Sequence, residues 1–189
     1  MTTTTDRSAV PLTRGRRSTA PQVRLVPPHE ASRYADQIKR LAFEAFSGPP
    51  WNETPAHAAL LAARFLDDTT RPGFLLAWVE HQAGEPVGFA YGLASWHLAI
   101  HAGHTVSPWS HPPFELREIA VAQRFRGQGI GALLHDAVLS ATPPRPRWLV
   151  THPAATAALA LYRHRGWRAV RLVRGPDSDA LRLIMMRPR

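Results

Sequence analysis

The feature that most constrains the fold is a glycine-rich turn between an apolar strand and an apolar helix. Residues 121–134 read VAQRFRGQGIGALL, with glycine at every second position from Gly127 to Gly131. Glycine tolerates a positive φ angle and lets the backbone approach a ligand closely. The first amides of a helix attract anions, and Arg124 and Arg126 add positive charge beside them. The turn therefore predicts a phosphate or pyrophosphate site, although a tight turn without a ligand would also use glycine.

Two other phosphate-binding folds do not fit this turn. A P-loop needs a Gly-Lys-Ser/Thr sequence, and the one lysine of the chain, Lys39, lies in a different predicted helix. A dinucleotide-binding turn is compatible with Gly127-x-Gly129-x-x-Ala132, but it requires an acidic residue at the end of the next strand. That strand, residues 147–151, reads RWLVT and holds no carboxylate, and the chain that remains is too short for a doubly wound sheet.

Hydrophobic periodicity and turn residues place strands and helices along the rest of the chain. Strands are predicted at residues 23–26, 74–80, 87–96, 114–121, 147–151, 167–173 and 181–186. Helices are predicted at about residues 34–46, 55–66 with Thr54 as the N-cap, 129–141 and 153–165. The histidine-rich segment 97–113 is predicted to be irregular. Strands and helices alternate in the second half, which indicates an α/β fold with antiparallel hairpins at both ends.

Length and composition limit the classes of protein that the chain can form. One domain accounts for 189 residues, and residues 1–20, which have almost no large apolar side chain, are predicted to be a disordered tail before a folded domain at 21–189. The absence of cysteine excludes disulfides, zinc–thiolate sites and thiol catalysis. No apolar run is long enough to span a bilayer and no secretory signal is visible, so a cytoplasmic location without a membrane partner is expected.

The formal net charge of +9 is unevenly distributed. Residues 145–189 carry a net charge of +8, whereas the central block 25–144 carries −3. A basic surface attracts nucleic acid, anionic membranes or anionic cofactors. Because the sequence offers no recognition helix or stacking platform, charge alone does not predict a nucleic-acid partner.

Two motifs in the second half resemble one enzyme family. Arg124-x-x-Gly127-x-Gly129 resembles the acetyl-CoA-binding motif of the GNAT (GCN5-related) N-acetyltransferases. Ala158-x-x-Leu161-Tyr162-x-x-x-Gly166-Trp167 is similar to the last helix and following strand start of that family. The resemblance covers residues 21–189 and is strongest over 114–168. It implies the GNAT fold, a mixed central sheet of about seven strands with helices on both faces and with the fourth and fifth strands splayed apart.

The resemblance also implies that acetyl-CoA is the acyl donor and that it binds along the glycine-rich turn. Amides around the turn would hold the pyrophosphate of coenzyme A, with Arg124, Arg126, Gly127, Gln128, Gly129, Ile130, Gly131 and Ala132 as contact residues. The end of the fourth strand would pair with the pantetheine arm through Ile119, Ala120 and Val121. One of its amides would polarise the thioester carbonyl and stabilise the oxyanion that follows.

An amine attacks only when it is unprotonated, so a group near the thioester must accept its proton. Glu115 and Glu118 are the carboxylates on the strand beside the thioester. Their odd spacing would aim them at opposite faces of a regular strand. The bulge that is common in this strand of the family leaves the choice between them open. The alternative for Glu118 is an ion pair with a nearby arginine.

Tyr162 matches the family tyrosine that protonates the departing thiolate, and it is the third catalytic candidate. The alternative is a core aromatic beside Leu159 and Leu161. The family often has asparagine seven residues before this tyrosine, where the present chain has Ala155. That contact to the cofactor is therefore lost, or it is supplied by Thr151, His152 or Thr156.

Two further segments are candidates for the wall of an acceptor pocket. Trp51-Asn52-Glu53 follows the first long helix, and Trp96 and Trp109 belong to the histidine-rich stretch. Loops beside a binding slot commonly carry specificity, but these aromatics alternatively pack the loops against the core. A metal site is not expected from the four histidines of the stretch, because no Asp or Cys lies near them: His97, His101, His104 and His111.

The chain is thus expected to be a GNAT-type acyltransferase that moves an acetyl group from acetyl-CoA to a primary amine by direct transfer within a ternary complex. The acceptor, a small-molecule or peptide amine, is not identified by the sequence, and a homodimer is left open. The alternative is a non-catalytic acyl-CoA-binding module with a regulatory role. Such a module would tolerate the loss of Tyr162 and of both glutamates.

Overall fold

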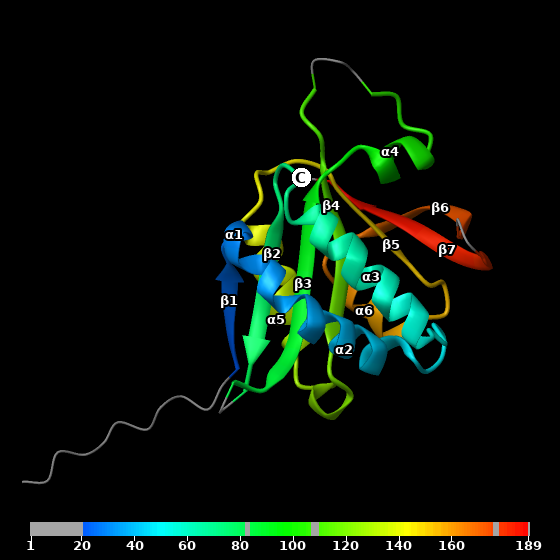
Figure 1. Cartoon of the computed structure of the whole chain (residues 1–189). Helices are drawn as coiled ribbons and strands as arrows, with labels where there is room; N and C mark the ends of the chain where they lie inside the picture. Colours follow the sequence, from blue (N-terminus) through cyan, green and yellow to red (C-terminus); the bar gives the residue numbers. More distant parts are fainter. Residues whose placement is uncertain (1–20, 82–83, 107–109, 176–177, 189) are drawn as a thin grey trace, which may run out of the picture.

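A seven-stranded mixed sheet forms the centre of the protein (Figure 1). The computed structural model describes residues 21–81, 84–106, 110–175 and 178–188, so the predicted tail at 1–20 lies outside the described residues. The strands follow the spatial order β1-β2-β3-β4-β5-β7-β6. Their bounds are β1 Gln22–Val26, β2 Leu75–Glu80, β3 Pro86–Ala94, β4 Phe114–Val121, β5 Arg147–Thr151, β6 Arg168–Gly175 and β7 Ser178–Arg187. Within this sheet β4 and β5 are parallel, and the other neighbouring strands are antiparallel.

Helices cover both faces of the sheet, as the family resemblance implies (Figure 1). Their bounds are α1 Pro28–Ala31, α2 Ala35–Phe46, α3 Pro55–Asp68, α4 His97–His101, α5 Ile130–Ser140 and α6 Thr156–His164. Apolar residues of α2 and α3 pack with Trp78, Phe89 and Tyr91 on one face. Those of α5 and α6 pack with Leu116 and Leu149 on the other. The alternation of side chains along each strand therefore divides the core into two layers.

The start of α3 follows the predicted capping pattern. Thr54 is the N-cap in an extended conformation, and Pro55 occupies the first helical position. The His57 amide donates to the Thr54 hydroxyl at 3.4 Å, and the Thr54 amide donates to Nδ1 of His57 at 3.2 Å. This reciprocal cap fixes where α3 begins, and the helix then carries Arg64 to the sheet.

Besides the unpredicted helix α1 and a longer β7, two elements differ from the prediction in a way that shows how tertiary contacts set boundaries. Residues 97–113 are not wholly irregular, because His97–His101 form α4. The Ser95 hydroxyl accepts from the His97 amide at 3.1 Å, and Leu98 packs in the small cluster around Trp148. The last helix begins at Thr156 rather than at Pro153, after a turn in which the Ala154 amide donates to Nδ1 of His152 at 3.0 Å. In both places side-chain acceptors and burial decided boundaries that local sequence patterns did not.

The fourth and fifth strands separate after a short pairing, as expected for this fold. Phe114–Leu116 of β4 pair with Arg147–Leu149 of β5, and the pairing ends there. A bulge at Arg117 accompanies the separation, since Glu118 lies opposite Tyr91 whereas Leu116 lies opposite Gly92. The side of β4 that faces β5 is therefore without a neighbouring strand beyond Leu116.

Glycine at position 92 permits the close strand contact beside this bulge. A Cβ atom added to Gly92 would lie 2.3 Å from the Glu115 carbonyl oxygen and 2.5 Å from the Phe114 ring. Backbone atoms cannot move away from such a clash without breaking the β3–β4 pairing.

None of the helices in the described part of the chain is long and apolar enough to cross a membrane.

Candidate active site

The glycine-rich turn joins the end of β4 to the start of α5. Gly127 has a φ angle of +75° and Gly129, the N-cap of α5, has a φ angle of +78°. A Cβ atom added to either glycine would meet no heavy atom within 4 Å. Backbone conformation rather than crowding therefore requires glycine at these two positions. The space that a side chain would fill outside the turn is open to a ligand.

The amides of the turn are free to bind such a ligand. Within the described residues, those of Gly127 through Ala132 donate to no carbonyl or side chain, and the first amide of the helix that does so is Leu133, to the Gly129 carbonyl at 3.0 Å. Free amides at a helix N-terminus, together with the positive end of the helix dipole, form a site for a phosphate group. The turn therefore fits the pyrophosphate of acetyl-CoA.

The two arginines of the motif have other partners in this structure. The Arg124 guanidinium is ion-paired with Glu85 and lies over the Phe125 ring, 5.0 Å from its centroid. Arg126 donates from Nη2 to the Ala45 carbonyl at 2.6 Å. Both side chains hold the turn against neighbouring elements, so the donors left free at the turn belong to the backbone.

Glu118 lies just beyond the point where β4 leaves β5. Its Oε1 is 2.6 Å from Nη2 of Arg64 on α3, and its side chain retains 20% exposure. Burial raises the pKa of Glu118 to about 7, although the charge of Arg64 acts in the opposite direction. The ion pair that was the alternative prediction for Glu118 is therefore present. The same carboxyl group nevertheless titrates near neutral pH, where a general base is most effective.

Glu115 occupies a different environment. Its Oε1 accepts from the Leu98 amide of α4 at 2.6 Å, its Oε2 lies 3.5 Å from Nη2 of Arg117, and its side chain is fully buried. In a regular strand the spacing of the two glutamates would aim their side chains at opposite faces of the sheet. The bulge changes this arrangement. Glu115 and Glu118 lie opposite Leu93 and Tyr91, two residues apart on β3, so both face the same side.

Tyr162 on α6 combines a buried ring with a hydroxyl that has no partner. The residue is 8% exposed, and its hydroxyl makes no hydrogen bond with the described residues. Burial raises the pKa of Tyr162, and the negative charge of Glu118 raises it further. The hydroxyl therefore stays protonated at neutral pH, as a proton donor must. The ring packs in the core, as one alternative predicts, and the hydroxyl is available for the proton donation that the other alternative requires.

A hydrogen-bonded network that the sequence did not reveal supports the Tyr162 ring. Nε1 of Trp167 donates to Nε2 of His135 at 2.9 Å, and Nδ1 of His135 lies 2.7 Å from Asp136. Asp136 in turn accepts two hydrogen bonds from Arg165. The Tyr162 ring lies 6.0 Å from the Trp167 ring and 6.4 Å from the His135 ring. His135 was not among the residues predicted from the sequence, although helical spacing places it on the same buried stripe as Leu134, Val138 and Leu139.

Several charged and aromatic side chains from elements far apart in the sequence are linked to Glu118, either directly or through one another. The Tyr91 hydroxyl is buried, and the charges of Glu118 and Arg64 both affect its pKa, which burial raises. Burial raises the pKa of Glu53, and the charges of His57, Arg182 and Arg64 act in the opposite direction. We refer to this group as the Glu118 cluster; it comprises Trp51, Glu53, Arg64, Tyr91, Glu118 and Arg182. Sequence reasoning found Trp51, Glu53 and Glu118, but not the other three.

The position of Ala155 removes one predicted cofactor contact. Ala155 is the buried N-cap of α6 and supplies no side-chain hydrogen bond there. The ring of His152 lies 5.6 Å from the Trp51 ring. Thr151 is buried and Thr156 is exposed.

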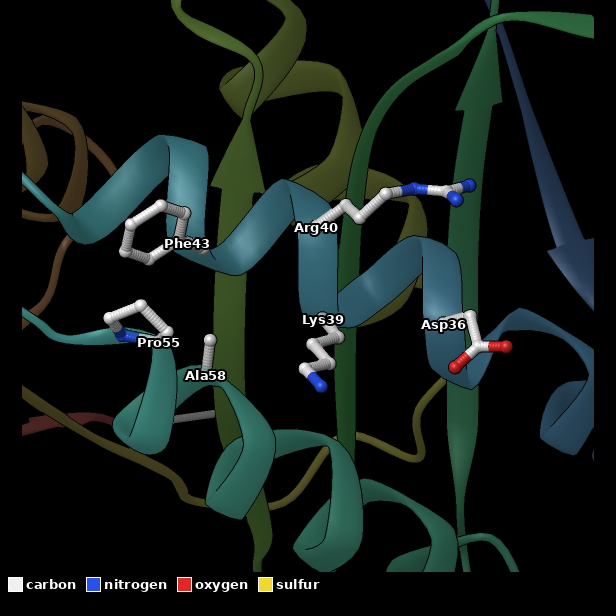
Figure 2. Close-up of a pocket in the computed structure, with 6 residues that line it drawn as sticks. All are labelled: Asp36, Lys39, Arg40, Phe43, Pro55 and Ala58. Carbon is white, nitrogen blue, oxygen red and sulfur yellow. The ribbon is translucent and has the colours of Figure 1, made fainter.

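Two hollows lie outside this region. One, of about 340 Å³, lies between α2 and α3, where Lys39 and Phe43 stand across from Pro55 and Ala58 (Figure 2). The other, of about 500 Å³, includes Trp96, His104, His111 and Trp148.

The second hollow adjoins the start of β4, the end opposite the glycine-rich turn. The described part of the histidine-rich stretch, which the sequence placed beside the acceptor, therefore lies away from Glu118, and Trp109 lies outside the described residues. Among the residues that the structure describes, no group of three or more His, Asp or Glu side chains is arranged to hold a metal ion.

Comparison with known proteins agrees with this geometry. Residues 35–167 match the model of the acetyltransferase (GNAT) family. Similar folds include a histone acetyltransferase HPA2-related structure from Corynebacterium glutamicum, with TM-score 0.62, 21% identity, and coverage of 89% of this chain and 96% of that chain. Ard1 from Thermoplasma volcanium has TM-score 0.57 and 22% identity, with coverage of 89% and 97%.

A third similar fold contains the acyl donor. The phosphinothricin acetyltransferase from Sinorhizobium meliloti, solved in complex with AcCoA, has TM-score 0.59 and 20% identity, with coverage of 89% of this chain and 88% of that chain. The sequence matches no curated protein. At these identities the structures establish the fold, whereas the family model spans well over half of the chain. The chain therefore belongs to the GNAT family of acetyltransferases.

Proposed function

We propose that the protein transfers the acetyl group of acetyl-CoA to a primary amine, directly and within a ternary complex. The observation that carries this proposal is that free backbone amides follow a strand, β4, whose edge is unpaired on one side. The unpaired amides of Gly127–Ala132 follow immediately after the part of β4 that has no neighbour on the β5 side. Bound acetyl-CoA would supply the reactive thioester at this place.

The end of β4 provides the binding edge for the extended arm of the donor. Ile119, Ala120 and Val121 pair with β3 on one side only, so peptide-like groups can add to the other side as a strand would. The turn amides then hold the diphosphate. An amide of this edge polarises the acetyl carbonyl, which is how such sites stabilise developing negative charge.

Two side chains move the protons. Glu118 accepts the proton of the amine, directly or through water, because its carboxyl group is half ionised near pH 7. Tyr162 donates the proton that the departing thiolate requires, because its hydroxyl is protonated and free of other partners. Glu115 is assigned a structural role, since its carboxylate accepts the Leu98 amide and is fully buried.

A non-catalytic acyl-CoA-binding module, the alternative function, would not require the Glu118 carboxyl group or the Tyr162 hydroxyl group. In this chain Glu118 and Tyr162 lie close enough for the charge of one to shift the pKa of the other. A binding module would have no use for a free hydroxyl and a neutral-pH carboxyl group placed in this way. Their proximity favours the enzyme.

Initial-rate kinetics with a panel of primary amines tests the proposal. We expect coenzyme A thiol release that depends on the amine, and intersecting double-reciprocal lines when both substrates are varied. Parallel lines would contradict direct transfer. Acetyl-CoA binding without thiol release for any amine would support the non-catalytic module, and the absence of acetyl-CoA binding would contradict both functions.

A further inference from the structure

Two charged residues of the Glu118 cluster have no part in the proton transfers described above. Glu53 lies in the loop between α2 and α3, and Arg182 lies on β7. Among the described side chains, Glu53 makes no ion pair or hydrogen bond, and Arg182 has no carboxylate within 4.0 Å. Within the described residues, the side chain of Arg182 makes one hydrogen bond, from Nη1 to the adjacent Leu181 carbonyl at 3.3 Å. Each residue therefore retains most of its capacity to bind an opposite charge.

Ring contacts hold Arg182 at the end of β5 where the strands are splayed. Its Cζ lies 5.3 Å from the centroid of the Trp51 ring, and the Trp51 ring lies 5.6 Å from that of His152. His152 directly follows the last residue of β5, Thr151, which pairs with Leu183 on β7. A guanidinium that stacks on an indole keeps its N–H edge free for a planar anion.

The charges of the cluster also connect Arg182 to the catalytic carboxylate. The charges of His57, Arg182 and Arg64 act on Glu53, and Glu53 in turn acts on Glu118. Arg64 is already bound to Glu118 at 2.6 Å, and Arg117, which also acts on Glu118, is ion-paired with Asp68 and Glu115. Among the described residues of the cluster, the anion without an ion pair is Glu53, and the cation without one is Arg182. A ligand that satisfies both must carry a positive group and a negative group.

We propose that the acetyl acceptor is an amino acid, a small molecule in which the reacting primary amine and a carboxylate occur together. This inference rests on the proposed transferase function and assigns its substrate class. The acceptor carboxylate binds the free edge of Arg182 above Trp51, where two parallel hydrogen bonds fix its orientation. The amino group then points toward Glu53 and Glu118.

The balance of the reaction agrees with this arrangement. The acceptor arrives as a zwitterion, and its ammonium group releases one proton to solvent before attack. The amine nitrogen then forms a bond to the acetyl carbon as the carbon–sulfur bond breaks, the second nitrogen proton passes to Glu118, and the thiolate takes the proton of Tyr162. Glu118 afterwards releases its proton, Tyr162 regains one from solvent, and the product leaves as an N-acetyl carboxylate. Because the product has lost its positive charge, it no longer satisfies Glu53, and its release is favoured.

Matched acceptors test the proposal. For several side chains, we would compare the amino acid, its carboxamide and the amine that lacks the carboxyl group, with the thiol assay and a correction for the fraction of free amine. For the wild type, we expect kcat/KM to be at least about tenfold higher for the amino acid than for either analogue, mainly because KM is lower. Arg182→Gln should remove this preference by raising KM for amino acids while leaving carboxamides unchanged. The Arg182→Lys variant should retain part of the preference for amino acids, because lysine keeps the positive charge.

Arg168→Gln is the matched control, because Arg168 is an exposed arginine opposite Met186, at the far end of the β6–β7 pair. It should leave both classes of acceptor unchanged. Equal kcat/KM for amino acids and carboxamides in the wild type would overturn the inference while leaving the transferase function intact. An equal loss for both classes in Arg182→Gln would also overturn it. Failure of every amine to release thiol would contradict the transferase function itself.

Discussion

The glycine-rich turn and the Glu118 cluster adjoin the open end of β4, but they are built in opposite ways. The turn takes its donors from the backbone of six consecutive residues, Gly127–Ala132. The cluster takes its groups from side chains of a loop and four separate elements, with Arg64 on α3 and Arg182 on β7. The first is local in sequence, and the second exists only after the sheet and its helices have assembled. We therefore expect substitutions in the turn to affect donor binding, and those in the cluster to affect chemistry and acceptor choice.

The largest effect on acetyl-CoA affinity is expected from Gly129→Glu, which tests the backbone part of this comparison. The side chain would place a negative charge in the open space where the diphosphate binds, at a φ angle of +78°. Acetyl-CoA affinity measured by calorimetry should fall by at least about 100-fold, equivalent to about 2.7 kcal/mol or more.

Gly103→Glu provides the control for backbone strain. Gly103 has a φ angle of +86°, and an added Cβ would meet only a guanidinium nitrogen of Arg171 at 3.7 Å. It lies before β4 rather than after it, so acetyl-CoA affinity should be retained while thermal stability falls as in Gly129→Glu. Unchanged affinity in Gly129→Glu would mean that the turn does not hold the donor.

Tyr162→Phe tests the side-chain part of the comparison. The ring and its packing against Trp167 remain, but the proton donor is lost. The single-turnover rate of acetyl transfer should fall by about 10²–10⁴, the range for one general acid. Acetyl-CoA affinity should change little. A wild-type single-turnover rate would show that Tyr162 is only a packed aromatic.

Glu118→Gln should produce a smaller loss of about 10²-fold, because water can still accept the amine proton. The raised pKa of about 7 means that the carboxyl group is protonated and inactive below that pH and ionised above it. With an alkyl amine of pKa near 10, log kcat/KM in the wild type should therefore rise with slope two below about pH 7 and slope one above it.

The Glu118→Gln variant should show slope one across the whole range. Glu115→Gln sharpens the test, because that residue accepts the Leu98 amide within the core. It should lower the melting temperature and keep the change of slope near pH 7. A change of slope that persists in Glu118→Gln would assign the titration to another group.

The smallest effect is expected from removal of residues 1–20. Their sequence brings almost no apolar surface to a core, so a chain that starts at Pro21 should keep the melting temperature, acetyl-CoA affinity and turnover within about twofold. A large loss in any of the three would make the segment part of the domain.

Much of the fold could be predicted because its signals are local. Strand alternation, helical periodicity, the Thr54–Pro55 cap and the paired glycines each depend on a few consecutive residues. The helix α4 and the later start of α6 escaped prediction because they depend on acceptors elsewhere, such as the Ser95 hydroxyl and Nδ1 of His152. The bulge at Arg117 likewise became certain only from the pairing of β4 with β3.

The sequence by itself indicated the family, the position of the glycine-rich turn, and Tyr162, Glu118 and Glu115 as the candidates for proton transfer. These follow from motifs in which backbone conformation and residue type are set within a short stretch of chain. Only the tertiary structure distinguished the environments of Glu118 and Glu115, because a single bulge residue brought both to one face and gave them different neighbours there. The partners Arg64, Tyr91 and Arg182 also depended on it, since charges and aromatic rings act through distance in space, which separation along the chain does not record.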